Sequence, residues 1–279
     1  MPISYLRRFT SKKEGSRLWV FDKGSELFFP TSPEKVAREY GFYSDEDEKK
    51  LSEVVESPVS PILDKLCRFE HLDKKERGLL AYYLAVFLMR VPKRRTRALA
   101  NAPEVIDRTV DRVVHKIHQL TDKHLLDNHL AMQRIAEAEE ARDKLNNQLP
   151  EEVIEHIRSP WPSKRLEQAV FNMKWRFART DGPVFFLTTD NPVFFFEAYG
   201  LGRREAELSF PISSRLALFA SNSMHEDGLF VESRQSLVKE INRRLASSAT
   251  RFICYHQEAP WIKAIALKKT PYLSRISWD

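Results

Sequence analysis

A stretch of twelve residues, FFLTTDNPVFFF at 185–196, sets two aromatic, apolar runs on either side of a short polar segment. Phenylalanine, valine and threonine at this density favour β-strand. The Asn-Pro dipeptide interrupts regular structure, because the proline ring keeps Asn191 out of the helical region. We therefore predict a strand, a tight polar turn and a second strand, with Asp190 and Asn191 at the end of a buried element. Polar side chains in such a place need hydrogen-bond partners or a function.

Strand-like segments lie near both ends of the chain, with helical segments between them. They are expected at 3–9, 17–22, 26–29, 175–178, 184–188, 193–196, 207–211, 215–220, 229–231 and 251–255. This order is typical of an α+β fold. We predict a single α+β domain over residues 1–279, with one mostly antiparallel sheet built from the N-terminal hairpin and the C-terminal strands. Residues 74–172 are predicted to form a helical subdomain or insertion within it.

Three helical patterns stand out in the middle of the chain. Asp73 is a suitable N-cap for an apolar helix at 74–90, in which leucine, tyrosine and phenylalanine recur at helical spacing. Further helices are expected at 103–119 and 122–147. The last is rich in good helix formers, and its apolar positions thin out toward its C-terminal end. We expect that half to face solvent or to pack on a partner, which includes a second copy of the chain.

The charge balance makes this a mildly basic protein. Its formal net charge is +6 and its pI is about 9.2, which permits contact with nucleic acid or another polyanion without requiring it. The clearest basic run contains Arg94, Arg95 and Arg97. Such a run can meet phosphates, but it is also what a solvated surface looks like. No aromatic side chains are interleaved near Arg94 for base stacking.

Several classes of protein carry sequence marks that this chain lacks. It has no run of about 18 apolar residues for a membrane span, and its first residues do not follow the signal-peptide pattern. Cys67 and Cys254 imply no disulfide framework, so a reducing compartment, the cytoplasm, is expected. No Walker-type loop, Gly-x-Gly-x-x-Gly fingerprint or His-Glu-x-x-His motif is present. We therefore predict no metal site and leave the cofactor open.

Four segments occur in an order and spacing that resemble a known family. They are PISYLRRF at 2–9, RLWVFDK at 17–23, SPEKVAREYGFYS at 32–44 and FLTTDNPV at 186–193, with a weaker fifth, PISSR, at 211–215. The chain is similar along nearly its whole length to the uncharacterised, mainly bacterial family catalogued as domain of unknown function 4238. The resemblance implies a shared fold and no established activity. Family members usually carry a histidine just before the first segment, where this sequence has Met1. Either translation starts here and any chemistry of that histidine is missing, or the start of the sequence was assigned late.

Asp190 and Asn191 are the leading catalytic candidates. A carboxylate at a strand end can act as a general base or hold a metal. The alternative is an Asx-type turn, in which the side chain caps its own backbone. Thr189 adds a hydroxyl that would line a pocket or only favour the strand. Arg90, at the end of the apolar helix, would bind an anion or pair with Asp190, or else be a cation that stabilises a helix C-terminus.

Ser213 and Asn242 are further candidates for binding residues, together with Arg94 and Arg95. Ser213 follows a proline and precedes a strand, but it lacks the Gly-x-Ser-x-Gly setting of a nucleophile. A structural turn closed by its hydroxyl is the alternative. Asn242 lies in a helix before the final strand.

Two functions from different classes follow from these observations. The leading hypothesis is a cytoplasmic bacterial protein that acts on or binds a phosphate-rich partner such as nucleic acid, with a role as a defence effector as one form of it. The alternative is a non-catalytic interaction or regulatory module, in which helix 122–147 binds a partner or a second copy. Whether the chain is an enzyme is left open.

Overall fold

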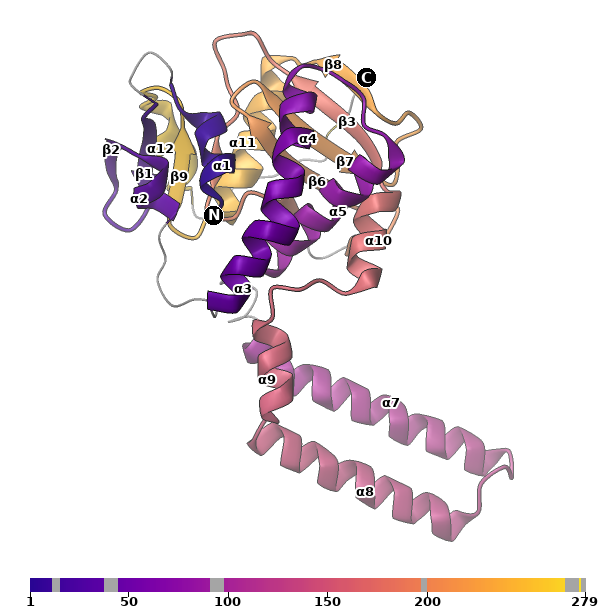
Figure 1. Ribbon diagram of the computed structural model, residues 1–279. Coiled ribbons are helices and arrows are strands. Elements are labelled where there is room, and N and C mark those ends of the chain that lie inside the picture. Colours follow the sequence, from indigo (N-terminus) through magenta and orange to yellow (C-terminus); the bar gives the residue numbers. More distant parts are fainter. Residues whose placement is uncertain (12–15, 38–44, 91–97, 197–199, 269–275, 277–279) are drawn as a thin grey trace. The chain divides into compact units, whose positions relative to one another are not determined.

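The structure is a computed structural model of the 279-residue chain. It describes residues 1–11, 16–37, 45–90, 98–196, 200–268 and 276, with the backbone alone described at 45, 152 and 156–158. The chain divides into two compact units, the first made of Met1–Val91 and Pro160–Asp279 and the second of Pro92–Ser159 (Figure 1). The second unit lies inside the predicted helical subdomain at 74–172, whose limits stay a prediction.

In the described part of the first unit, one sheet has four antiparallel strands in the order β2-β1-β9-β4. They are β1 Leu18–Asp22, β2 Leu27–Thr31, β4 Thr188–Thr189 and β9 Phe252–Tyr255. β1 and β2 form the predicted N-terminal hairpin. β9 connects this hairpin to β4, because Val20 and Thr188 both lie opposite Cys254.

A second sheet in the same unit has the order β5-β6-β7-β3-β8. Its strands are β3 Lys174–Arg179, β5 Phe194–Phe195, β6 Glu207–Ser213, β7 Leu216–Ser221 and β8 Leu229–Glu232. Neighbouring strands run antiparallel, except that β3 and β8 run parallel. The α+β class with mostly antiparallel strands is therefore confirmed.

The strands form two sheets where one was expected. The two strands of the stretch 185–196 both exist, but β4 belongs to the first sheet and β5 to the second. Pro192 has no N–H for a ladder, and it restricts Asn191 to extended backbone. The chain therefore passes from one sheet to the other at this point.

The N-terminal segment expected as a strand at 3–9 is helical, so that prediction is wrong. It consists of α1 Ile3–Leu6 and the 3₁₀ turn η1 Arg7–Phe9. Tyr5 and Phe9 are both buried, and their ring centroids lie 5.4 Å apart, one helical turn along the chain. Burial at this spacing outweighs the preference of isoleucine, tyrosine and phenylalanine for strands.

The first unit contains further helical elements. They are α2 Pro33–Ala37, α3 Asp45–Lys50, the π-helical turn η3 Leu51–Glu56, α4 Ser57–Cys67, α5 Lys74–Met89, α10 Lys164–Asn172, α11 Gln235–Ser248 and α12 Trp261–Ala266. α5 is the apolar helix predicted at 74–90. Asp73 caps it with a capping box: its carboxylate accepts from the Glu76 amide and the Glu76 carboxylate accepts from the Asp73 amide, each at 2.8 Å.

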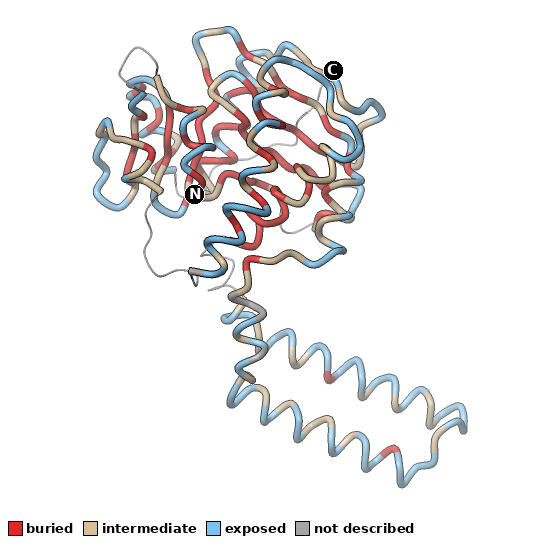
Figure 2. Tube along the Cα trace, in the orientation of Figure 1, coloured by how far each residue is buried: buried red, intermediate tan, exposed pale blue. Residues whose placement is uncertain are grey.

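The two faces of the second sheet bury different kinds of side chain. Alternate residues of a strand point to opposite faces, so Leu208 and Phe210 of β6 pack with α4 and α5, in one hydrophobic cluster. Glu207 and Ser209 belong to the opposite face, where Arg244 of α11 bonds to both. Figure 2 shows the buried residues concentrated in the sheets and in the helices that cover them. This alternation brings charged groups into the interior on the α11 side.

The second unit is helical where it is described. It contains α7 Ala102–Asp122, α8 Asn128–Asn147 and α9 Glu151–Arg158. The helix expected at 122–147 begins only at Asn128. Asp127 caps α8 by accepting from the amides of His129 and Leu130, which starts a new helix after a turn. α7 and α8 pack against each other as a helical hairpin. Among the described helices of both units, none has the length and apolar character to cross a bilayer.

Candidate functional site

Asp190 connects the end of β4 to the start of β9. Its Oδ1 accepts a hydrogen bond from the amide of Thr250 at 2.8 Å. Its Oδ2 accepts from the amides of Arg251 at 2.6 Å and Phe252 at 3.1 Å. Hydrogen bonds to an ionised carboxylate are shorter and stronger than those between neutral groups. We call Asp190 with Thr250, Arg251 and Phe252 the carboxylate latch, since it joins segments 60 residues apart in sequence.

Thr189 and Asn191 close a tight turn around Asp190. The Thr189 hydroxyl donates to the Asn191 carbonyl at 2.7 Å and accepts from the Asn191 amide at 3.1 Å. Ser248, at the end of α11, donates its hydroxyl to the same carbonyl at 3.3 Å, and its backbone carbonyl accepts from the Asn191 side-chain amide at 3.4 Å. The predicted polar turn is therefore present, and α11 holds it in place.

Asn242 serves the same stretch from the middle of α11. It is fully buried. Its side-chain nitrogen donates to the Phe185 carbonyl at 2.8 Å, and its side-chain oxygen accepts from the Leu187 amide at 3.1 Å. A carboxamide can satisfy one donor and one acceptor of an extended backbone at once. Asn242 thus takes the place that a neighbouring strand would have beside residues 185–187.

Four of the five segments that carry the family resemblance are joined near this turn. The Tyr5 hydroxyl donates to the Pro211 carbonyl at 2.8 Å and lies 2.7 Å from the Thr188 hydroxyl, and burial raises the pKa of Tyr5 well above its ordinary value. Asp22 of β1 accepts from both Nε and Nη2 of Arg251 at 3.1 and 2.8 Å. These hydrogen bonds lower the pKa of Asp22. Three distant parts of the chain therefore converge beside the carboxylate latch.

Arg90 lies in a different group of contacts. Its guanidinium is 3.1 Å from a carboxylate oxygen of Glu56 and 3.8 Å from one of Glu48. Burial raises the pKa of Glu56, and the Arg90 charge opposes that shift. The described contacts thus bind Arg90 to the α3–α4 region and Asp190 to the latch, and they do not bring the two predicted partners together.

The other predicted residues are dispersed. The Ser213 hydroxyl accepts from the amide of Arg215 at 3.2 Å, which closes the turn between β6 and β7. Arg94 and Arg95, with Arg97, lie outside the described residues. Within the part of the chain that the structure describes, no three His, Cys, Asp or Glu side chains are grouped as a metal ion would require. The catalytic and binding roles of the named residues stay predictions.

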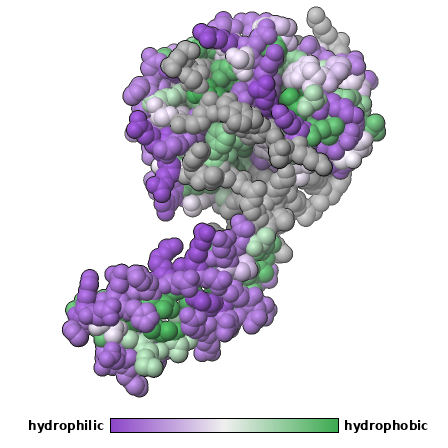
Figure 3. All heavy atoms as spheres, turned by 180° about the vertical axis from the view of Figure 1, so that it is seen from behind, coloured by the Kyte–Doolittle hydropathy of each residue, from purple (hydrophilic) through white to green (hydrophobic). Residues whose placement is uncertain are grey.

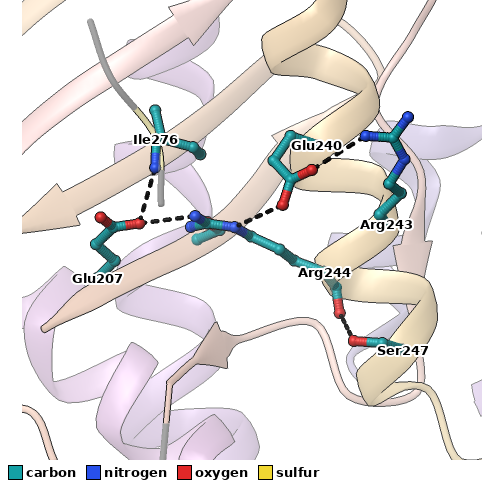
Figure 4. A network of polar contacts seen from close by, with 7 residues as sticks. Glu207, Glu240, Arg243, Arg244, Ser247 and Ile276 are labelled. Carbon is teal, nitrogen blue, oxygen red and sulfur yellow. Dashed lines mark hydrogen bonds and ion pairs between the residues drawn. The ribbon is translucent and has the colours of Figure 1, made fainter. Parts of the chain in front are cut away.

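The strongest concentration of buried charge was not predicted from the sequence. Arg244 of α11 is 0% exposed. Its Nη2 lies 2.7 Å from a Glu207 carboxylate oxygen, and its Nε lies 3.7 Å from one of Glu240 (Figure 4). Arg243 reaches the second Glu240 oxygen at 3.1 Å, and the Ile276 amide donates to Glu207 at 3.2 Å. We call Arg244, Glu207 and Glu240 the buried ion network.

Aromatic rings surround the guanidinium of this network. The Arg244 carbon Cζ lies 4.9 Å from the ring centroid of Phe196, 5.6 Å from that of Phe194 and 5.9 Å from that of Phe219. Burial lowers the pKa of Arg244, and Glu207 opposes that shift. The sequence signal was a lone acid, Glu207, at the start of an otherwise uncharged strand.

A family model catalogued as a protein of unknown function, DUF4238, matches residues 1–259. The chain belongs to the DUF4238 family. No curated protein and no solved structure matches it. The match includes all four segments of the resemblance, so the latch and the buried ion network both lie within the part of this DUF4238 chain that defines its membership.

The carboxylate latch and the buried ion network both have the chemistry of contacts that stabilise a fold. In the latch, carboxylate oxygens point at backbone amides, and in the network each described charge faces an opposite charge. Buried charges are tolerated when they are paired and hydrogen-bonded. The latch therefore fixes the start of β9 beside β4 in the first sheet, and the network fixes α11 against β6 of the second sheet of the DUF4238 fold.

We expect Asp190→Ala to lower the free energy of unfolding by about 1.5–3 kcal/mol, because three amides lose an ionised acceptor. Asp190→Asn should cost less, since one side-chain oxygen remains. Asp181→Ala, which removes an exposed carboxylate, serves as the control and should change stability by less than about 0.5 kcal/mol. Urea unfolding followed by circular dichroism measures all three. Equal stability of Asp190→Ala and wild type would contradict the latch.

Arg244→Ala should destabilise the protein by about 3–5 kcal/mol, because it leaves Glu207 buried without its counter-charge. The neighbouring Arg243→Ala removes a half-exposed ion pair and should cost at most about 1 kcal/mol. Adding Glu207→Gln to an Arg244→Met variant should recover part of the loss, since no unpaired charge is then buried. Denaturant midpoints measure the effect, and similar midpoints for the two arginine variants would argue against the network.

Proposed function

We propose that this DUF4238 chain is a protein-interaction module whose binding surface is the α7–α8 hairpin. The observation that carries the proposal is an apolar stripe on α7 that is covered only in part. Val110 is buried in the hairpin, whereas Val113, one turn further along α7, is 46% exposed.

The stripe follows a regular pattern, with its middle residue exposed and the other two half-buried. Ile106, Val113 and Leu120 recur every seven residues, which places them on one side of α7. Val110 and Ile117 form the adjacent stripe, with the same spacing. Together the two stripes alternate at spacings of four and three residues, which is the apolar seam by which one helix packs along another. We call Ile106, Val113 and Leu120 the α7 stripe.

Apolar side chains are also exposed around the turn of the hairpin. Leu125 is 71% exposed and Met132 is 74% exposed, and Leu130 is exposed too. Figure 3 shows hydrophobic atoms at the surface of the hairpin, bordered by hydrophilic ones. Contiguous exposed apolar surface with a polar border is characteristic of interaction sites.

The hairpin buries little of its own surface. Among their described residues, α7 buries Val110 and α8 buries Ala131. Most helix stability in proteins comes from packing of the apolar face, so two helices with so small a shared core gain from a partner. Arg142 of α8 adds polar contacts to Asp107 and Asp111 of α7, which set the pairing of the helices.

In this proposal the first unit is a scaffold for the hairpin. Its latch and buried ion network occupy their charges with internal partners, as described above. Both cysteines, Cys67 and Cys254, are free, which supports placing the protein in the cytoplasm, a reducing compartment.

Val113→Glu should abolish hairpin-dependent association, because a charge in the apolar stripe would be buried without a partner. The test uses the full chain and a lysine-reactive cross-linker in cells, with adducts mapped to Lys116, Lys123 and Lys144 of the hairpin. We expect at least a fivefold loss of adducts for Val113→Glu. Val105→Glu makes the same change at an exposed position of α7 outside the stripe and should retain them. Equal adduct yields for both variants and wild type would contradict the proposal.

Binding of a polyanion such as nucleic acid, including a role in bacterial defence, is the second candidate. The observation that favours it is the placement of charge. Residues 92–159 contain twelve Lys and Arg and twelve Asp and Glu, so their charges balance overall, but these charges are not evenly distributed. Within 92–159, the basic residues cluster at 93–97, where a phosphate backbone would be met.

If the chain binds a polyanion through this run, Arg94→Glu combined with Arg95→Glu should weaken binding of a single-stranded oligonucleotide at least tenfold. The slope of log affinity against log salt concentration should also fall by about two, one for each phosphate contact. Arg108→Glu, at an exposed position of the hairpin, is the matched control. Fluorescence anisotropy at several salt concentrations measures both quantities. Equal affinities of the double variant and wild type would exclude the run as the site.

A further inference from the structure

We infer that the partner of the hairpin is the hairpin of a second copy of this chain, paired antiparallel so that each tip lies against the other's base. The inference rests on the proposed function and adds the identity of the partner. The base is defined as residues 102–112 and 137–147, and the tip as residues 113–136. The side chain of Asn146 donates to that of Asp107 at 3.1 Å, so the first half of α7 and the end of α8 lie together at the base.

The charges of the hairpin differ between its two ends. The base contains seven acidic and four basic residues, whereas the tip contains two acidic and three basic ones. The tip also holds His115, His118, His124 and His129. Pairing in the same direction would place two acidic bases side by side. Antiparallel pairing places each basic tip beside an acidic base, and such complementarity sets the orientation of a complex.

The α7 stripe is complementary to itself in this arrangement. Val113 lies within one residue of the middle of α7, which runs from Ala102 to Asp122. In a two-fold symmetric antiparallel pair, residues at the centre meet their own copies. Val113 would therefore pack against Val113 of the second copy. Ile106 and Leu120 are each seven residues from Val113, so Ile106 of one copy would face Leu120 of the other.

The size of the hairpin fits another hairpin better than a single helix. Helices of this length extend about 30 Å, and two packed helices present a face about 20 Å wide. Two such faces bury roughly 1,200 Å² in total, which is the lower limit for a specific and stable interface. A single partner helix would cover about half of that area. The four helices together would form a bundle with the apolar stripes inside.

Sedimentation equilibrium of the full chain between about 1 and 100 μM tests the pairing. We expect a species of twice the 32.7 kDa chain mass that dissociates at low concentration. Val113→Glu should raise the dissociation constant at least tenfold, and Val105→Glu should change it less than twofold. Circular dichroism confirms that both variants stay folded.

Disulfide cross-linking tests the antiparallel register. In a Cys67→Ser background, Val113→Cys should form a cross-linked dimer on oxidation, because the two positions meet at the symmetry axis. Ile106→Cys alone should not cross-link, but a mixture of Ile106→Cys and Leu120→Cys chains should. Cross-linking of Ile106→Cys with itself, without cross-linking in the mixture, would overturn the antiparallel arrangement.

The outcomes separate this inference from the proposed function. A wild-type chain that stays monomeric at 100 μM, yet loses cellular cross-links on Val113→Glu, would overturn the second copy as partner and keep the interaction module. A monomer without stripe-dependent cross-links would overturn both. A dimer unaffected by Val113→Glu would place self-association elsewhere on the chain and overturn the inference.

Discussion

One carboxylate, that of Asp190, accepts hydrogen bonds from three backbone amides, and the assembly of the first unit depends on this contact. Asp190 stands where the chain leaves the first sheet for the second, and the amides it binds open strand β9. β9 is the strand that connects the N-terminal hairpin to β4. Asp190 therefore acts at the junction of the N-terminal segment, the central aromatic stretch and the C-terminal strand. An ionised acceptor suits this junction, because amides at the start of a strand have no ladder partner of their own.

The buried ion network follows from the same geometry. Once β6 is fixed beside β7, the period of two along the strand directs Glu207 to the side of α11. Asn242 and Ser248 bind α11 to residues 185–191, and this sets the rotation of the helix that brings Arg244 to Glu207. The cost of burying these charges is offset by their mutual pairing and by the phenylalanine rings around the guanidinium. The hydrogen bonds to residues 185–191 and the buried ion network thus both depend on the position of α11.

Local sequence patterns predicted the elements that are stabilised locally. The capping signal of Asp73 and the apolar spacing after it gave α5, and the Asn-Pro dipeptide gave the turn at residue 191. The partition into two sheets was not predictable, because alternation identifies a strand without naming its neighbour. The contacts of Asp190 were missed for a similar reason: its partners lie 60 residues away. An Asx-type turn was the nearest alternative. The Asp190 side chain does accept hydrogen bonds from backbone amides, but these belong to residues 250–252 and not to its own turn.

The two units differ in what they leave unsatisfied. The first encloses its apolar clusters and pairs Arg244 with Glu207 in its interior. The second unit has equal numbers of opposite charges over residues 92–159, and its hairpin has a small core, so the unit as a whole has no net charge to attract or repel other surfaces at long range. Its binding energy must then come from apolar contact, and its charges can only orient that contact. A surface of this kind distinguishes between partners by their shape and by the register of the contact. A stripe that is symmetric about Val113 suits such recognition.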